Sequence, residues 1–144
     1  PRNQWAKWGV QRVSGGALPS DAVKASLLLP MGRHGPAFLA YDNFGVYLQW
    51  NQSLNYATTA AYLATRIAGA PKMRTGRDDI PVLSGDETKE LQQLLVKNGY
   101  DVGAIDGLVG EKTRLAVKQM QIKFKLPADS YPTPELLHRL RGGS

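Results

Sequence analysis

The sequence predicts a mainly α-helical protein with a small β-hairpin, divided into residues 1–70, a linker at 71–81 and residues 82–144. Capping signals open two helices after residue 82, with a further helix between them, and two aromatic runs flank a turn near residue 42. The linker is rich in Pro, Lys, Arg and Asp and has no apolar periodicity, which is typical of a connecting segment. A length of 144 residues suits one ordinary domain or two small ones.

The first part combines an expected helix with an expected hairpin. Ser20-Asp21 is a cap signal, and the following residues predict a short helix that ends at Leu28. Residues 37–41 and 45–50 favour two strands, with Asp42-Asn43 in the turn between them. Because a two-stranded hairpin is not stable alone, we expect this part to pack on a larger domain that this chain lacks.

An Ala-rich helix should follow the hairpin. Ser53 is a suitable N-cap for a helix over residues 54–68. Helical spacing predicts that its inner face includes Tyr56, Ala60, Leu63 and Ile67.

The second part predicts three helices around one small core. Ser84 is followed three residues later by a glutamate, which is a capping box, and Gly99 ends that helix. Apolar residues at helical spacing predict a second helix over 111–124. Thr133 as N-cap, with a proline at the first helical position, opens the third helix.

Composition excludes several classes of protein and leaves the partner open. No apolar run approaches the roughly 18 residues of a membrane span, and the absence of cysteine excludes a disulfide framework and a thiolate metal site. The formal net charge is +6, with nine Lys/Arg against four Asp in residues 1–80 and nine against eight acidic residues in 81–144. Such a basic first part favours a polyanion such as peptidoglycan, nucleic acid or anionic lipid. A charge that serves only solubility is an equally good interpretation.

The residues indicate no self-sufficient active site. Residues 1–80 contain no glutamate, and their aspartates fall at an expected helix start, in a turn and in the linker. The four glutamates lie near expected helix starts, where they favour the helix dipole. His34 and His138 lack metal-ligand spacing, and there is neither a phosphate loop nor a Gly-x-Ser-x-Gly elbow. We therefore expect no metal and no cofactor.

Aromatic side chains indicate more about the function of the first part than its charged residues do. Flat amphipathic rings stack on sugar faces while their polar edges reach hydroxyl groups, although the alternative is that most of these rings fill a core. Trp50, just before polar Asn51, is the best candidate for an exposed ring. The rings are Trp5, Trp8, Tyr41, Phe44, Tyr47, Trp50, Tyr56 and Tyr62.

Residues 82–140 resemble the small three-helix peptidoglycan-binding domain that is often appended to wall hydrolases. The stretch 99–113 carries this resemblance, with glycines at four offsets and an Asp106-Gly107 turn between two expected helices. Further matching residues are Leu91-Gln92-Gln93-Leu94-Leu95, Ala116-Val117, Gln121 and Leu126-Pro127. The chain departs from the family at Asp129-Ser130-Tyr131, where an Asp-Gly turn is usual, and we expect a reshaped loop there. The resemblance implies binding to peptidoglycan, with Tyr100, Asp106 and Arg114 as candidate binding residues because they flank the central loop.

Residues 1–70 resemble the C-terminal portion of the lysozyme-like catalytic region of B-type lytic murein transglycosylases. The residues that carry this resemblance are Leu29-Pro30-Met31-Gly32, Gly35-Pro36-Ala37-Phe38-Leu39, Tyr41-Asp42-Asn43-Phe44 and above all Trp50-Asn51-Gln52-Ser53-Leu54-Asn55-Tyr56-Ala57. In that family an aromatic-Asn-x-Ser-x-x-Tyr segment lines the glycan cleft. The resemblance therefore implies substrate binding by Trp50, Asn51, Ser53 and Tyr56, with Asn51 and Tyr56 near the reacting sugar and Ser53 capping the helix.

The resemblance also implies a reaction and a location. In these enzymes one glutamate protonates the bond between N-acetylmuramic acid and N-acetylglucosamine, and the muramic 6-hydroxyl closes on C1 to give a 1,6-anhydro product. That glutamate is expected upstream, so we expect no catalytic residue in this chain, which starts at Pro1 without an initiator Met. The implied partners are peptidoglycan and a missing N-terminal catalytic part. The implied location is the periplasm of a Gram-negative bacterium, with outer-membrane association through the missing N-terminus.

Two other hypotheses compete with this one. In a non-catalytic cell-wall-binding module, residues 1–80 would be a scaffold, and Asn51 and Tyr56 would have no part in cleavage. A nucleic-acid binder would need Lys and Arg interleaved with aromatic residues on one surface. The nearly balanced charge of the second part disfavours it, so we expect no nucleic-acid partner.

Overall fold

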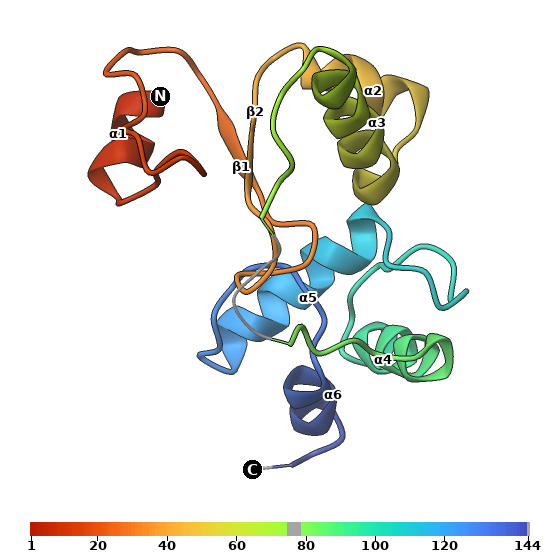
Figure 1. The fold of residues 1–144 in the computed structure, drawn as a ribbon. Coiled ribbons are helices and arrows are strands. Elements are labelled where there is room, and N and C mark those ends of the chain that lie inside the picture. The colour runs from red at the N-terminus through yellow and green to blue at the C-terminus, as the bar shows by residue number, and fades with distance from the viewer. Residues whose placement is uncertain (75–78, 144) are drawn as a thin grey trace.

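The computed structural model describes residues 1–74 and 79–143, and it is mainly helical with one small antiparallel sheet (Figure 1). Residues 75–78 of the expected linker lie outside the described residues. The elements in chain order are α1 (Arg2–Lys7), β1 (Ser26–Leu28), β2 (Phe38–Ala40), α2 (Phe44–Trp50), α3 (Leu54–Ile67), α4 (Gly85–Lys97), α5 (Glu111–Lys123) and α6 (Pro134–Leu140). The fold class expected from the sequence is therefore confirmed. No helix within the described residues is long and apolar enough to cross a membrane.

Helices α4, α5 and α6 enclose a common apolar core, as the sequence predicts. Ser84 and Glu87 form both hydrogen bonds of the expected capping box at the start of α4, and the Thr133 side chain caps α6. Packing of the three apolar helix faces stabilises each short helix beyond its own propensity. The buried core consists of Leu91, Leu95, Val102, Ala116, Val117, Met120, Leu136 and Leu137.

The hairpin expected over residues 37–50 is wrong in one of its two strands. β2 is a strand, but it pairs with β1, in the register Ser26↔Ala40, Leu27↔Leu39 and Leu28↔Phe38. Residues 45–50 instead belong to helix α2, which packs on α3. A short apolar run is compatible with a strand or a helix when periodicity alone is considered. Here packing against α3 favours the helix.

The helix expected from Ser20-Asp21 to Leu28 is also wrong. Within the described residues this segment contains no helix, and it ends in β1. Asp21 pairs with Arg2 of the unexpected helix α1, and Trp5 Nε1 donates to the Ala25 carbonyl at 2.8 Å. The segment from Asp21 to Leu28 therefore makes its hydrogen bonds with α1 and with β2 instead of within a helix.

The inner face predicted for α3 differs from the observed one. Its boundaries and its Ser53 cap match the prediction, but its buried residues are Ala57 and Thr58. Leu63 is 57% exposed and Ile67 is 80% exposed. Among the described residues of the first part, Ala57 is the only buried hydrophobic residue, so this part has no core of its own there.

The two parts meet along α5. Figure 1 shows the connection between β1 and β2 descending to α5, while α2 and α3 stand above its N-terminal end. Contacts across this boundary come from residues that are far apart in sequence, such as Pro30 and Arg114. The boundary therefore brings the first part next to the three-helix unit.

Candidate functional site

The corner between α2 and α3 presents two aromatic rings to solvent. Trp50 ends α2 and is 84% exposed, and Tyr56 in the first turn of α3 is 50% exposed. Asn51 adopts an extended conformation between the helices, and its Oδ1 accepts from the Ser53 N–H at 2.8 Å. Ser53 Oγ in turn accepts from the Tyr56 N–H at 3.3 Å. Asn51 and Ser53 thus fix the backbone between the two rings.

This corner has the chemistry of a sugar-binding surface. Exposed aromatic rings offer flat apolar faces, and the Tyr56 hydroxyl is a donor and an acceptor. The structure brings together the four residues predicted to bind substrate, Trp50, Asn51, Ser53 and Tyr56, within one short stretch of chain. Ser53 has the predicted capping hydrogen bond.

The carboxyl groups with shifted pKa values are suited to structural roles. Their pKa values are all lowered, and the largest cause is in each case a hydrogen-bond donor aimed at the carboxylate, from an arginine, a lysine or a backbone N–H. A general acid for glycosidic cleavage needs a raised pKa. The groups with lowered pKa values are Asp21, Glu87, Glu90, Asp101 and Asp106.

The central loop of the three-helix unit is held by buried Gln92. Its Nε2 donates to the carbonyls of Ala104 and Leu108 at 3.1 and 2.9 Å, and its Oε1 accepts from the Gly107 N–H at 2.9 Å. Asp106 Oδ1 accepts from the Leu108 N–H at 2.8 Å, which closes the expected turn. This one side chain thus fixes both ends of the loop.

The two loop residues predicted to bind peptidoglycan differ in exposure. Asp106 is exposed, whereas Tyr100 is half-buried and packs against the apolar core. Ile105 and Leu108 beside them are 43% and 70% exposed. The loop therefore offers a carboxylate together with apolar side chains.

A second glutamine holds the loop before α6 in the same way. Gln121 Nε2 donates to Asp129 Oδ1 at 2.8 Å and to the Tyr131 carbonyl at 3.0 Å, and its Oε1 accepts from the Ser130 N–H at 2.9 Å. Ser130 has φ of 63°, close to the 81° of Gly107 in the central loop. Ser130 thus adopts the left-handed conformation that glycine favours, and a loop reshaped relative to the family stays a prediction.

Arg114 of α5 lies at the boundary between the two parts and is only 9% exposed. Its Nη2 donates to the Pro30 carbonyl at 2.8 Å and to Asn55 Oδ1 at 3.3 Å, while its buried Nε has no hydrogen-bond partner among the described residues. Burial lowers the pKa of Arg114 from its usual value. These contacts join α5 to the first turn of α3, and a role of Arg114 in peptidoglycan binding stays a prediction.

Asp129 makes a second connection across the boundary. Its Oδ2 accepts from the Arg33 N–H at 3.0 Å. A Cβ at Gly32 would lie 2.9 Å from Asp129 Oδ2 and 2.9 Å from Tyr131 Cβ, and φ at Gly32 is +70°. Only glycine permits this close approach of the β1–β2 connection to the loop before α6.

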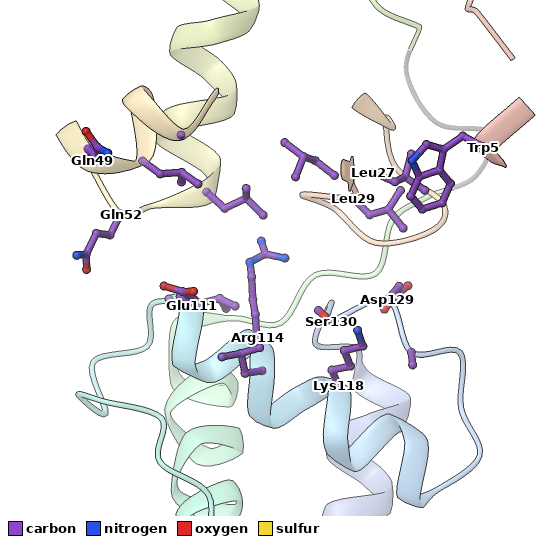
Figure 2. A pocket seen from close by; sticks show the side chains of 18 residues that line it. Trp5, Leu27, Leu29, Gln49, Gln52, Glu111, Arg114, Lys118, Asp129 and Ser130 are labelled. Atoms are coloured by element: carbon purple, nitrogen blue, oxygen red, sulfur yellow. The ribbon is translucent and has the colours of Figure 1, made fainter. Parts of the chain in front are cut away.

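A cleft of about 790 Å³ lies between the two parts on one side of Arg114. Figure 2 shows Arg114 rising from α5 towards the first part, with Gln49 and Gln52 on one side and Trp5, Leu27 and Leu29 on the other. Glu111 and Lys118 of α5 line the same cleft. A more apolar cleft of about 610 Å³, which includes Phe38 and Tyr62, also touches Arg114.

Comparison with known families assigns both parts of the chain. Residues 1–65 match the family described as "Transglycosylase SLT domain", and residues 84–140 match the family described as "Putative peptidoglycan binding domain". The first part of the chain is therefore similar to transglycosylase SLT domains, and the second part to peptidoglycan-binding domains. The chain combines a transglycosylase segment with a peptidoglycan-binding domain, as the sequence resemblances predict.

Solved structures of a B-type lytic transglycosylase extend this relationship. The chain is 45% identical to SltB3 from Pseudomonas aeruginosa in complex with NAG-anhNAM-pentapeptide, with a TM-score of 0.74. It is 46% identical, with the same TM-score, to SltB3 in complex with NAG-NAM-pentapeptide. Each match covers 98% of this chain and 38% of the SltB3 chain, so the chain spans well under half the length of that relative. No curated protein matches the chain.

Sequence reasoning missed the residues that hold the loops of the second part and that join the two parts of the chain. Gln92 and Gln121 stood in the family pattern, but no local signal showed that they are buried and bind loops. The sequence singled out Asp129 only because a serine follows it where an Asp-Gly turn is usual. Their partners in the tertiary structure, such as Arg33 for Asp129, cannot be read from local periodicity.

Proposed function

We propose that the intact protein binds peptidoglycan and cleaves the bond between N-acetylmuramic acid and N-acetylglucosamine, leaving 1,6-anhydro ends. The observation that carries this proposal is 45% identity, over 98% of the chain, to SltB3 in complex with NAG-anhNAM-pentapeptide. The two family matches support it, since one covers a transglycosylase segment and the other a peptidoglycan-binding domain. The match to only 38% of the SltB3 chain leaves room for a catalytic part beyond these residues.

In this proposal the α2–α3 corner forms part of the glycan cleft. Trp50 and Tyr56 stack on sugar rings, and Asn51 hydrogen-bonds near the reacting sugar, because these groups lie together at the surface. Ser53 holds the turn that aims them. The catalytic acid belongs to a further N-terminal part of the protein, an assignment supported by the absence of glutamate from residues 1–80.

The peptidoglycan-binding domain then keeps the enzyme on its insoluble substrate. Tyr100, Asp106 and Arg114 remain the proposed contacts, with Asp106 the most accessible of them. We further propose that the protein works in the periplasm of a Gram-negative bacterium, a location that its similarity to a cell-wall-acting transglycosylase supports. Attachment to the outer membrane would depend on a part of the protein outside this chain.

The test is cleavage of purified insoluble peptidoglycan by the intact protein, with mass spectrometry of the released muropeptides. We expect Trp50→Ala or Tyr56→Ala to reduce the release of anhydro-muropeptides about tenfold, since each substitution removes a stacking ring. Trp8→Ala is the matched control, because Trp8 is also exposed, at 66%, but lies on α1's end rather than at the corner.

Two outcomes would contradict the proposal. Normal cleavage by a folded Tyr56→Ala protein would remove the α2–α3 corner from the substrate site. Binding of the unaltered intact protein to peptidoglycan without any release of anhydro-sugars would favour the alternative function, a non-catalytic cell-wall-binding module.

A further inference from the structure

Two faces of helix α5 have different surroundings. One face lies in the core of the peptidoglycan-binding domain and contributes Ala116, Val117 and Met120. The other face carries residues at positions i, i+3, i+4 and i+7, which form one stripe on a helix. This stripe lines the 790 Å³ cleft and consists of Glu111, Arg114, Leu115 and Lys118.

The opposite wall of the cleft also combines apolar and polar side chains. Residues 27–29, Leu48 and Leu54 give it an apolar floor, and Gln49 and Gln52 stand at its rim. Both glutamines are exposed. Leu115 on the facing helix is 58% exposed, so the cleft offers apolar surface from both of its walls.

The two charges at the ends of the stripe are available to a ligand. Glu111 and Lys118 are exposed, and neither side chain makes a hydrogen bond or an ion pair with the residues that the structure describes. They lie seven residues apart on α5, which separates their backbones by about 10 Å. Arg114 and Asp129, by contrast, already hydrogen-bond across the boundary.

The cleft adjoins the corner proposed to hold the glycan. Gln49 and Gln52 lie on either side of Trp50 and Asn51 in the sequence, and both line the cleft. The cleft therefore begins next to the corner along the chain, within reach of a flexible group that hangs from a sugar held there. In peptidoglycan that group is the stem peptide, which is attached to the muramic sugar.

We propose that the cleft between α2 and α5 binds the stem peptide of peptidoglycan, an inference that rests on the proposed function. Lys118 pairs with a stem carboxylate and Glu111 with the amine of its diamino acid, while the leucine floor receives the alanine methyl groups. Gln49 and Gln52 hydrogen-bond to its backbone. An extended five-residue peptide spans about 17 Å, enough to contact both charges, and the cleft volume falls in the roughly 300–1,000 Å³ range of ligand pockets.

The test measures binding of two soluble probes to the intact protein by isothermal titration calorimetry. The probes are the free stem pentapeptide without sugars and a GlcNAc–MurNAc oligosaccharide without peptides. We expect Lys118→Glu to weaken pentapeptide binding about tenfold, the scale of one lost charge-assisted hydrogen bond, and to leave oligosaccharide binding unchanged. Glu111→Lys should act in the same way at the other end of the cleft.

Lys123→Glu is the matched control, because Lys123 is an exposed lysine on α5 that does not line the cleft, and it should bind both probes normally. Unchanged pentapeptide binding by both folded cleft variants would overturn the proposal. So would oligosaccharide binding without pentapeptide binding, which would leave the proposed function standing. Failure of the unaltered protein to bind either probe or insoluble peptidoglycan would overturn both proposals.

Discussion

Two buried glutamines explain why the loops of the peptidoglycan-binding domain hold their shape. Gln92 and Gln121 each use the side-chain oxygen to accept from one loop N–H and the side-chain nitrogen to donate within the same loop. The buried amides are thereby satisfied, which removes the desolvation penalty of an unpaired polar group. The residues with positive φ are the glycines Gly103 and Gly107 in the central loop, whereas the loop before α6 has Ser130 in this conformation.

Replacing Ser130 with glycine should therefore stabilise the domain. A left-handed conformation costs an L-residue about 1–2 kcal/mol, and glycine's larger loss of backbone entropy offsets part of the gain. We expect Ser130→Gly to raise the free energy of unfolding by about 0.5–1 kcal/mol in urea denaturation. Ser130→Ala, which keeps the Cβ, is the control and should give no gain. A loss of stability in Ser130→Gly would show that the serine side chain itself contributes to the loop.

At the scale of elements, two of the correctly predicted helices have capping hydrogen bonds that the sequence shows. The capping box of α4 and the Thr133 cap of α6 act between residues three apart, so they are visible in sequence. Helix α2 has no side-chain cap hydrogen bond. Its aromatic and branched residues favoured a strand by their type, and packing against α3 outweighed that preference.

The capping box should make the stability of α4 depend on acid pH. Glu87 accepts from the Ser84 N–H at 2.8 Å, and this hydrogen bond is the largest cause of its lowered pKa, below the ordinary 4.5. Because the folded pKa is depressed, this stabilisation is present above pH 4.5 and is lost as the pH falls through the folded pKa. Glu87→Gln keeps an accepting oxygen but does not titrate there, so its unfolding free energy should fall less between pH 6 and pH 2.

Thermal unfolding monitored by circular dichroism over that range measures the difference. Glu135→Gln, in the first turn of α6, controls for the removal of one carboxylate from a helix start. An acid loss in Glu87→Gln as steep as in the unaltered protein would show that the capping carboxylate contributes nothing to the pH dependence.

At the scale of the whole molecule, hydrogen bonds between residues far apart in sequence join the two parts. Arg114 reaches the first part through Pro30 and Asn55, and Asp129 reaches it through the Arg33 N–H. The Asn55 contact lies in the same helical turn as Tyr56 of the proposed glycan site. The orientation of the peptidoglycan-binding domain is therefore coupled to the part of the chain proposed to hold the sugar.

Arg114→Met should loosen this orientation and leave each part folded. The substitution keeps an apolar stem but removes the donors to Pro30 and Asn55. Because the sequence contains no cysteine, spin labels can be attached to cysteines introduced at exposed Ala64 on α3 and exposed Gln93 on α4. Pulsed electron paramagnetic resonance should then show a broader distance distribution than in the parent protein.

The matched control is Arg141→Met. Arg141 pairs with Glu90 at 2.6 Å inside the peptidoglycan-binding domain, away from the boundary between the two parts. Loss of this ion pair should leave the distance distribution unchanged. If Arg114→Met gives the same distribution as the control, other contacts fix the orientation of the domain.

The sequence by itself determined the helices of the peptidoglycan-binding domain, the cap of α3 and the family of both parts. Those features depend on caps, turns and periodicities that act over a few residues, and on motifs written in consecutive positions. Only the tertiary structure decided that β1 pairs with β2, that 45–50 is helical and which face of α3 is buried. It also decided that Arg114 is buried, since its partners Pro30 and Asn55 lie 84 and 59 residues away in the chain. Contacts over such separations depend on how whole elements pack, and no local pattern in the sequence encodes them.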